Sequence, residues 1–404
     1  MSTTGSSDGW PKVSVYENPG NLSAQKVAVL KEFWAKLLTF FTTELTVSKQ
    51  WDVFFPATAD EPETPQFRSI LDDFTPASFR DEFYKFVRND YADLLPMRFL
   101  QARSYEQDRA MRMLFTAMSY RKTAIPRAMM SEAKNDGDFI QAMKKGKSFV
   151  PCYDNQGRTI TCIRIKNHVR GDCSQDIFER YTLYAMEHAH LLHHQYEDRT
   201  VLLVDMSGFS ITSLDLSAIK FIIQNFEQYY PEELSEGVIH NAPWLFGTAW
   251  SIIKPLLRGP TRDKITFTSN LSELAAKIGR LPAERCLMAQ MQYIPKPDSE
   301  APFVDQTKDL SNASPECQAA FKMWNDNIAE FETITKEWTR PTASDAPLSD
   351  IESLNARRAE VIWRLSKSYW LIDEYVRPKS YYDRAGLLPP SKDNALTVCP
   401  AQKG

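Results

Sequence analysis

Short β-branched runs alternate with helical patterns through the middle of the chain. Runs rich in valine, isoleucine and threonine occur at 159–165, 200–205, 237–242 and 264–269. Apolar residues at helical spacing lie between and after them, over 175–195, 215–230, 243–258 and 271–278. Strands that alternate with helices favour right-handed crossovers and a largely parallel sheet. We therefore predict an α/β domain over residues 136–290.

The segments on either side of this block show only helical spacing. A helix is predicted from about Ser23, and residues 67–135 read as several short helices. Ser104 and Gln107 have the spacing of a capping box for one of them. Two amphipathic helices on either side of the 340–349 loop predict an antiparallel hairpin. We expect four further regions: disorder over 1–21, a helical lobe over 22–135, a helical extension over 303–388 and a tail over 389–404.

Charge and composition narrow the class of protein. The 404 residues include 48 basic and 52 acidic side chains, which excludes a nucleic-acid binder driven by overall charge. No run of about 18 uncharged apolar residues occurs, and the six cysteines form no C-x-x-C pair. We expect reduced thiols, a cytoplasmic location and only peripheral membrane contact. The basic run Lys144, Lys145 and Lys147 fits either a solvated loop or a contact with anionic headgroups.

Two patterns invite a catalytic or metal interpretation. The sequence DMSGFS at 205–210 follows a predicted strand, but Thr212 stands where a nucleophile elbow needs glycine. A polar loop is therefore favoured over a serine hydrolase. His190 and His194 are spaced i, i+4 and could bind a metal, yet no further ligand of suitable type lies near them in the sequence. We expect a solvated helix face, no metal site and no cofactor.

Residues 243–258 are apolar on nearly all sides, and such a helix must be covered on both faces. Two interpretations are open. The segment is either a buried core helix or a lid whose inner face closes an apolar cavity and whose outer face meets a membrane. Gly247, Pro255 and Gly259 favour the lid because glycine and proline weaken a helix. The residues assigned to this gate helix are Trp244, Phe246, Trp250, Ile253 and Leu257.

Several ordered motifs carry a resemblance to a known family. They include Tyr230-Pro231-Glu232, Asn241-Ala242-Pro243, and Pro260-Thr261 followed by Lys264. The segments MRFLQARSYEQDRA at 97–110, NQGRTI at 155–160 and YVRPKSYYDRAGLL at 375–388 agree with them. Together they resemble the CRAL-TRIO lipid-binding family, and most of all its fungal phosphatidylinositol transfer protein branch. The resemblance runs from about residue 22 to about residue 388 and implies the CRAL-TRIO fold.

The resemblance also implies a site for a lipid headgroup. In that family an inositol phospholipid is held with its headgroup buried in the protein. Carried over to this sequence, Arg103 and Lys264 bind the phosphate, Thr261 donates a hydrogen bond, and Glu232 accepts one from the inositol ring. These residue types suit the task, because a phosphodiester needs cations and donors and a sugar-like ring needs an acceptor.

Three departures from the family pattern stand out. Ser104 replaces the basic residue that usually follows the arginine. Thr161 and Thr200 are polar as in the choline-binding relatives, but Leu202 is not, which puts phosphatidylcholine binding in doubt. The family's paired glycines after the last helix are replaced by LPAERCLMAQ at 281–290, which predicts a different floor for the pocket.

The resemblance implies a carrier and not an enzyme. We expect a monomer that binds phosphatidylinositol and exchanges it between membranes, with a second lipid as a further candidate ligand. No nucleic-acid partner is expected. Transient contact with the endoplasmic reticulum, endosomes or other organelles is expected. Two alternatives remain: a lipid-sensing module that presents its ligand to a lipid kinase or small GTPase, and a carrier of another hydrophobic ligand such as a sterol.

Overall fold

The computed structural model describes residues 22–43, 54–55, 65–193, 199–289, 291–297, 299–340 and 347–388. These residues form two compact units. The helical unit comprises the described residues up to Tyr120 together with 305–376, and the sheet unit comprises 121–304 and 377–388. The predicted disordered segment 1–21, the tail 389–404 and His194 lie outside the described residues.

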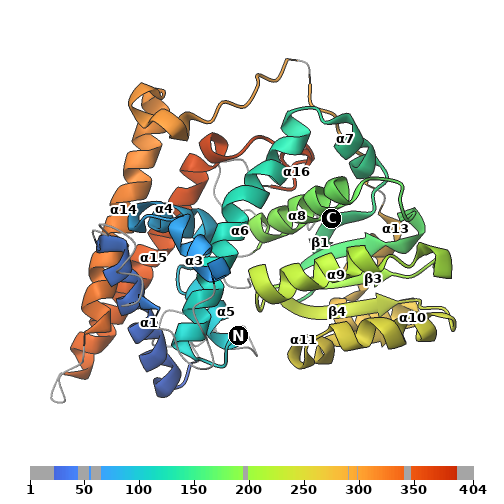
Figure 1. Cartoon of the computed structure of the whole chain (residues 1–404), viewed down its shortest axis with the longest axis horizontal. Coiled ribbons are helices and arrows are strands. Elements are labelled where there is room, and N and C mark those ends of the chain that lie inside the picture. Colours follow the sequence, from blue (N-terminus) through green and yellow to red (C-terminus); the bar gives the residue numbers. More distant parts are fainter. Residues whose placement is uncertain are drawn as a thin grey trace, which may run out of the picture. The chain divides into compact units, whose positions relative to one another are not determined.

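The sheet unit is built on five strands in the order β1-β2-β3-β4-β5 (Figure 1). Strands β2 to β5 are parallel, as predicted, and β1 pairs antiparallel with β2 at the edge. Strand β1 was not predicted, because Pro151 interrupts its pattern. Proline is tolerated in an edge strand, and the register shifts at this point. The strands are β1 (Ser148–Tyr153), β2 (Thr159–Arg164), β3 (Thr200–Asp205), β4 (Leu234–His240) and β5 (Ile265–Thr268).

Helices cover both faces of this sheet. One face is covered by α8 (Gln175–Leu191), α9 (Leu216–Gln224) and α10 (Phe246–Ile253), and the other by α12 (Leu271–Ile278) and α13 (Arg280–Met288). Side chains alternate between the faces along each strand. The residues that pack on α12 and α13 are fully buried: Ile160, Cys162, Val201, Leu203 and Val238. Their neighbours along the strands point toward α8, α9 and α10.

Local capping explains where these helices begin. The Ser174 hydroxyl accepts a hydrogen bond from the backbone of Ile177 at the start of α8, and Asp215 accepts one from Ala218 at the start of α9. The predicted bounds of α12 agree with the structure, but α8 ends at Leu191. After α9 the chain makes a π-helical turn over Asn225–Tyr229.

The remaining helices of the sheet unit are short. They are α7 (Gly137–Lys144), α11 (Gly259–Asp263) and α16 (Tyr381–Arg384), with 3-10 turns at Ile165–Asn167, Ile211–Ser213 and Lys254–Leu256. Helix α6 (Gln107–Ala133) contributes its first part to the helical unit and its second part to the sheet unit. The predicted capping box at its start is wrong. Ser104 and Tyr105 both have positive φ angles, whereas an N-cap residue has an extended backbone, and the helix begins only at Gln107.

The helical unit combines the N-terminal helices with the helices of residues 305–376 around one core. Its helices are α1 (Ala24–Thr42), α3 (Pro65–Asp72), α4 (Pro76–Val87), α5 (Leu94–Ala102), α14 (Pro315–Thr339) and α15 (Leu348–Val376), with a 3-10 segment at Gln306–Asn312. Helices α14 and α15 form the antiparallel hairpin, since Arg364 pairs with Glu330 and Trp338 bonds to Asn355.

A buried polar centre links this hairpin to the N-terminal helices. The Arg358 guanidinium donates to both oxygens of Asp93, at 2.7 and 2.6 Å, and Trp34 Nε1 donates to the same carboxylate at 2.7 Å. The Trp34 and Phe331 rings contact edge to face. The N-terminal lobe and the C-terminal extension, predicted as separate regions, therefore share one core.

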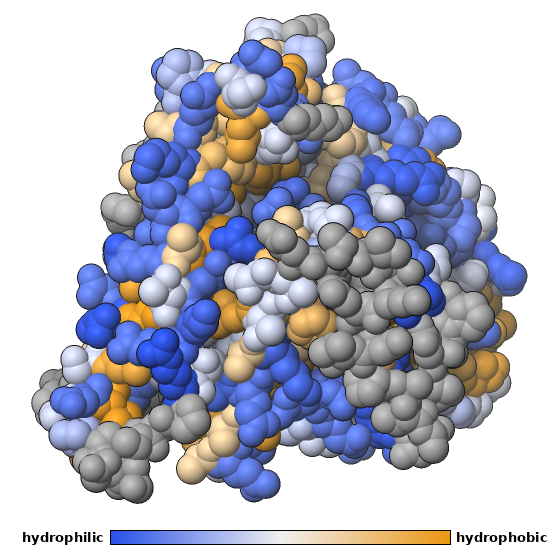
Figure 2. Space-filling view, turned by 60° about the vertical axis from the view of Figure 1, so that its left-hand side comes forward, coloured by the Kyte–Doolittle hydropathy of each residue, from blue (hydrophilic) through white to orange (hydrophobic). Residues whose placement is uncertain are grey.

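The face of the chain drawn in Figure 2 is mostly hydrophilic, with small separate hydrophobic areas.

Candidate functional site

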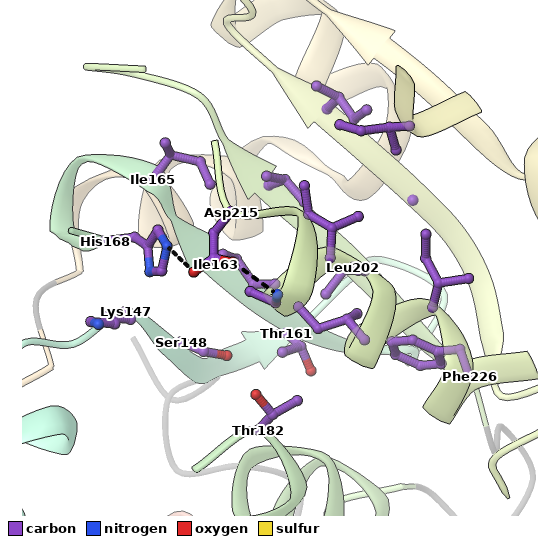
Figure 3. A pocket seen from close by; sticks show the side chains of 18 of the residues that line it. Lys147, Ser148, Thr161, Ile163, Ile165, His168, Thr182, Leu202, Asp215 and Phe226 are labelled. Carbon is purple, nitrogen blue, oxygen red and sulfur yellow. Dashed lines mark hydrogen bonds and ion pairs between the residues drawn. The ribbon is translucent and has the colours of Figure 1, made fainter. Parts of the chain in front are cut away.

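A cavity of about 250 Å³ lies between the sheet and the helices that cover one of its faces. Its floor is formed by the strand residues that point away from α12 and α13 (Figure 3). These are Thr161, Ile163, Leu202, Val204 and Ile239. The 281–290 segment was predicted to alter this floor. Its residues 281–288 instead belong to α13, which packs on the opposite face of the sheet through Ala283 and Cys286.

The walls of the cavity are mainly apolar. Helices α8, α9 and α10 and the turn after α9 contribute aromatic and aliphatic side chains, among them Phe178, Ala185, Ile219, Ile223, Phe226, Phe246, Trp250 and Ile253. Polar residues stand at intervals between them, including Thr161, Thr182 and Thr200. Such a lining is suited to hydrocarbon, with a few polar groups left to orient a ligand.

Two of the predicted headgroup residues form an ion pair at one edge of the sheet. Glu232 lies two residues before β4 and Lys264 immediately before β5, and β4 and β5 are parallel neighbours. The Lys264 ammonium donates to Glu232 Oε2 at 2.9 Å, and the side chains are 25% and 32% exposed. Glu232 and Lys264 are 32 residues apart in the chain, and the parallel pairing of β4 with β5 brings them together.

Tyr230 anchors the turn that presents Glu232. Its ring is fully buried, its hydroxyl donates to the carboxylate of Glu187, and the Arg121 guanidinium lies 4.9 Å from the ring centre. Arg121 also pairs with Glu187 at 2.9 Å. Burial raises the pKa of Tyr230 well above its usual value, so the phenol stays protonated. Glu232 has a φ angle of +60°, a conformation that costs backbone strain, and its side chain is partly exposed.

The other two predicted headgroup residues differ in their placement. Thr261, in α11, lines the cavity, and its carbonyl accepts from the Lys264 backbone at 3.2 Å. Arg103 belongs to the helical unit, at the end of α5, where its guanidinium donates to the Ala102 carbonyl at 3.0 Å. The structure thus brings Glu232, Thr261 and Lys264 together within the sheet unit.

The predicted gate helix is shorter than its apolar pattern. Helix α10 begins at Phe246, after Pro243, and gives way to a 3-10 turn that contains Pro255. Phe246, Trp250, Ile253 and Leu257 line the cavity. Trp244 lies before the helix, does not line the cavity and is 93% exposed. Four of the five residues assigned to the gate helix therefore face the cavity, and the fifth, Trp244, is exposed to solvent.

The histidine segment corrects one prediction. His190 and its neighbours His188 and His193 are buried, so they do not form a solvated helix face. The reason is a set of internal partners: His190 Nδ1 lies 3.1 Å from Glu233 Oε1, and His193 Nε2 lies 3.0 Å from the Thr200 hydroxyl. The prediction that the segment binds no metal stays a prediction.

Glu233 and Thr200 are cavity residues whose histidine partners were not predicted from the sequence. Both line the cavity. Glu233 contacts His190 at the end of α8, and Thr200 contacts His193 just after α8. Two signals were present: Glu233 follows the Tyr-Pro-Glu motif directly, and four histidines fall within 188–194. The sequence pattern could not show that the histidines at the end of α8 contact residues at the start of β3 and just before β4.

Among the described residues, no helix is both long enough and apolar enough to cross a lipid bilayer.

Comparison with known proteins agrees with this architecture. Residues 143–284 match the CRAL/TRIO domain model. A CRAL-TRIO domain-containing protein of Schizosaccharomyces pombe is 28% identical over 355 residues, which are 83% of this chain and 74% of that protein. Phosphatidylinositol transfer protein CSR1 of Eremothecium gossypii is 28% identical over 335 residues, 79% of this chain and 73% of its own length.

One solved structure, titled "Crystal structure of Sfh5", aligns with a TM-score of 0.43 and 18% identity over 65% of this chain and 85% of that chain. The matched region and the two fungal relatives thus carry the names of a CRAL/TRIO domain, a CRAL-TRIO domain-containing protein and a phosphatidylinositol transfer protein. Over residues 143–284 the chain is similar to the CRAL/TRIO domain, after which its relative in Schizosaccharomyces pombe is also named.

Proposed function

We propose that the protein binds phosphatidylinositol in the cavity of the sheet unit and exchanges it between membranes. One observation carries the proposal: an apolar cavity reaches Thr261 beside a partly exposed lysine–glutamate pair, Lys264 and Glu232. The similarity to a fungal phosphatidylinositol transfer protein supports the same ligand. No bond is made or broken in this function, and no cofactor or metal takes part in it.

The lysine–glutamate pair suits an inositol phospholipid because each partner fits one part of the headgroup. The Lys264 ammonium can donate to the phosphodiester, and the Glu232 carboxylate can accept from ring hydroxyls. Both side chains are partly exposed, so their mutual ion pair contributes at most about 1 kcal/mol and is readily exchanged for ligand contacts. Thr261 adds a hydroxyl donor from the cavity wall. Arg103 is proposed as a second phosphate contact.

The acyl chains would occupy the apolar part of the cavity. Each methylene removed from water is worth about 0.8 kcal/mol, so a carrier must replace the bilayer interior with a comparably apolar space. The floor and the walls formed by α8, α9 and α10 supply such a surface. A second lipid could occupy the same cavity, because a carrier that releases one ligand at a membrane needs another to replace it.

We further propose that α10 is the gate. The helix has eight residues, lacks a side-chain cap at its start and is followed by the 3-10 turn with Pro255. A short helix of this kind has little stability apart from its packing. Trp244 is exposed beside it, and the basic residues Lys254, Arg258 and Arg262 are exposed after it. Tryptophan and basic side chains favour the interface of an anionic membrane, where the gate would open. The carrier would act as a cytoplasmic monomer.

Transfer of labelled phosphatidylinositol between vesicles tests the headgroup site. We expect Lys264→Ala to reduce transfer and loading about 30-fold or more, because a buried phosphate would lose its cation. Lys277→Ala is a matched control, since Lys277 forms a similar pair with Glu236 at 2.8 Å in the same unit. Equal transfer by wild type, Lys264→Ala and Glu232→Ala would contradict the proposed site.

A further inference from the structure

The end of the cavity opposite Lys264 and Glu232 is also polar. In the parallel part of the sheet the amino ends of the strands share one edge and the carboxyl ends share the other. Glu232 and Lys264 precede β4 and β5, whereas His168 and Asp215 follow β2 and β3. Strands of six residues separate the two edges by about 20 Å. Figure 3 shows His168 and Asp215 facing each other at the cavity, with Lys147 and Ser148 on the same side.

The His168–Asp215 pair is placed by its elements but is not in hydrogen-bonding contact. Asp215 Oδ1 is held by the cap of α9, where it accepts from the Ala218 backbone at 3.1 Å and from the Ser217 hydroxyl at 2.7 Å. Asp215 Oδ2 lies 3.6 Å from His168 Nε2, which is too far for a hydrogen bond. Within the part of the chain that the structure describes, the buried Nε2 atom has no hydrogen-bond partner.

The charges around this pair balance. Lys147 lines the cavity and pairs with Asp172, which also accepts from Lys145 at 2.8 Å. Lys147 is buried, so the interpretation of this basic run as a solvated loop is wrong for that residue, which lies directly before β1 and pairs with Asp172. Two lysines and two aspartates, Asp215 included, leave this end of the cavity without net charge.

The protonation states follow from the same surroundings. Burial and then the charge of Lys147 lower the pKa of His168, so its imidazole is neutral at pH 7. Burial alone would raise the pKa of Asp215, but the hydrogen bonds from Ser217 and Ala218 lower it, so Asp215 is a carboxylate. The pair therefore offers an ionised acceptor and a neutral imidazole nitrogen.

We propose that the His168–Asp215 pair binds the hydroxyl group of a hydrophobic alcohol, such as a long-chain alcohol or a sterol, whose apolar part lies in the cavity. A hydroxyl group can donate to Asp215 Oδ2 and at the same time accept from His168 Nε2 in the tautomer that carries its proton on Nε2. The end of a plain acyl chain would leave both groups unpaired, at a cost in free energy. A phosphate would meet the Asp215 carboxylate, and an ammonium group would meet Lys147. A neutral hydroxyl fits best.

A competition experiment with matched probes tests this inference. An apolar fluorescent dye bound in the full-length protein is displaced by 1-hexadecanol or by hexadecyl methyl ether, which cannot donate a hydrogen bond. We expect the alcohol to compete about tenfold more strongly in the wild type, the strength of one hydrogen bond to a charged acceptor. Asp215→Asn, which keeps a capping side chain, and His168→Phe should each bring the two probes to within about twofold.

The control is Thr182→Val, which removes a cavity hydroxyl that already donates to the Phe178 carbonyl at 2.9 Å. This variant should keep the tenfold preference. Equal competition by the two probes in the wild type, no competition by either, or a preference that survives both substitutions would overturn the inference. The inference rests on the cavity and goes beyond the proposed function. A chain that prefers the alcohol but transfers no phosphatidylinositol would support the hydroxyl site and contradict the proposed transfer function.

Discussion

The two faces of the central sheet are built from the same strands and serve different ends. On the face toward α12 and α13, Ile160, Cys162, Val201 and Leu203 are completely buried in a continuous apolar core. On the other face their sequence neighbours, among them Thr161, Leu202 and Val204, line a cavity. One face is filled by the protein's own side chains, and the other leaves room for a ligand.

The difference shows how one β-sheet can combine stability with binding. Packing on α12 and α13 supplies the burial that holds the strands in register. The opposite face is then free to carry threonines and partly exposed aliphatic residues, which would weaken a dry core. We expect substitutions on the first face to change folding and substitutions on the second to change ligand binding.

The largest contrast is expected between two adjacent leucines on β3. Leu203→Ala should lower the free energy of unfolding by about 2–5 kcal/mol, because it empties a fully buried position. Leu202→Ala should cost about 1 kcal/mol or less, since Leu202 already borders the cavity, and should alter lipid loading. Urea denaturation of both variants measures the difference. Equal losses of stability would show that the cavity face is packed as tightly as the other.

A second prediction concerns the free energy of unfolding at alkaline pH, which depends on Cys162 in the packed face. Burial raises the pKa of Cys162 to about 12, whereas a cysteine in the unfolded chain has a pKa of about 8.5. Between these values the folded state keeps a proton that the unfolded state has released, so stability falls as the pH rises.

This linkage amounts to about 1.4 kcal/mol per pH unit. Cys162→Ala should remove it, so that its free energy of unfolding falls less steeply than that of the wild type between pH 9 and 11. Urea denaturation under reducing conditions measures both slopes. Parallel curves for the two proteins would mean that the Cys162 thiol is not shielded from solvent.

The smallest expected effect concerns the outer side of the cavity face. Trp244→Ala should weaken binding to anionic vesicles about fivefold, or about 1 kcal/mol, because the exposed ring no longer enters the membrane interface. Trp363→Ala is the matched control, as Trp363 is a partly exposed tryptophan of the helical unit. Vesicle sedimentation measures this binding. An equal loss of vesicle binding in the two variants would show that the α10 region is not the membrane contact.

Sequence pattern predicted most of the sheet unit and less of the site. The four parallel strands were found because β-branched runs mark buried strands, and α12 was found over its full length. Strand β1 was missed because of Pro151, and α10 was overextended because an apolar run does not show where a helix gives way to a turn.

The candidate site depended on contacts across the chain, which periodicity does not report. Glu232 and Lys264 were identified through motifs, and their ion pair follows only from the parallel pairing of β4 with β5. The burial of His190 against Glu233 and the placement of Asp215 beside His168 needed the three-dimensional structure. The role of Arg103 stays a prediction.

Native mass spectrometry of the purified protein after exposure to phosphatidylinositol vesicles tests the central claim most directly. The account predicts one phosphatidylinositol molecule per wild-type chain, its loss in Lys264→Ala, and its retention in the Lys277→Ala control. A wild-type chain that carries no lipid under these conditions, or a Lys264→Ala chain that loads phosphatidylinositol as fully as the wild type, would contradict it.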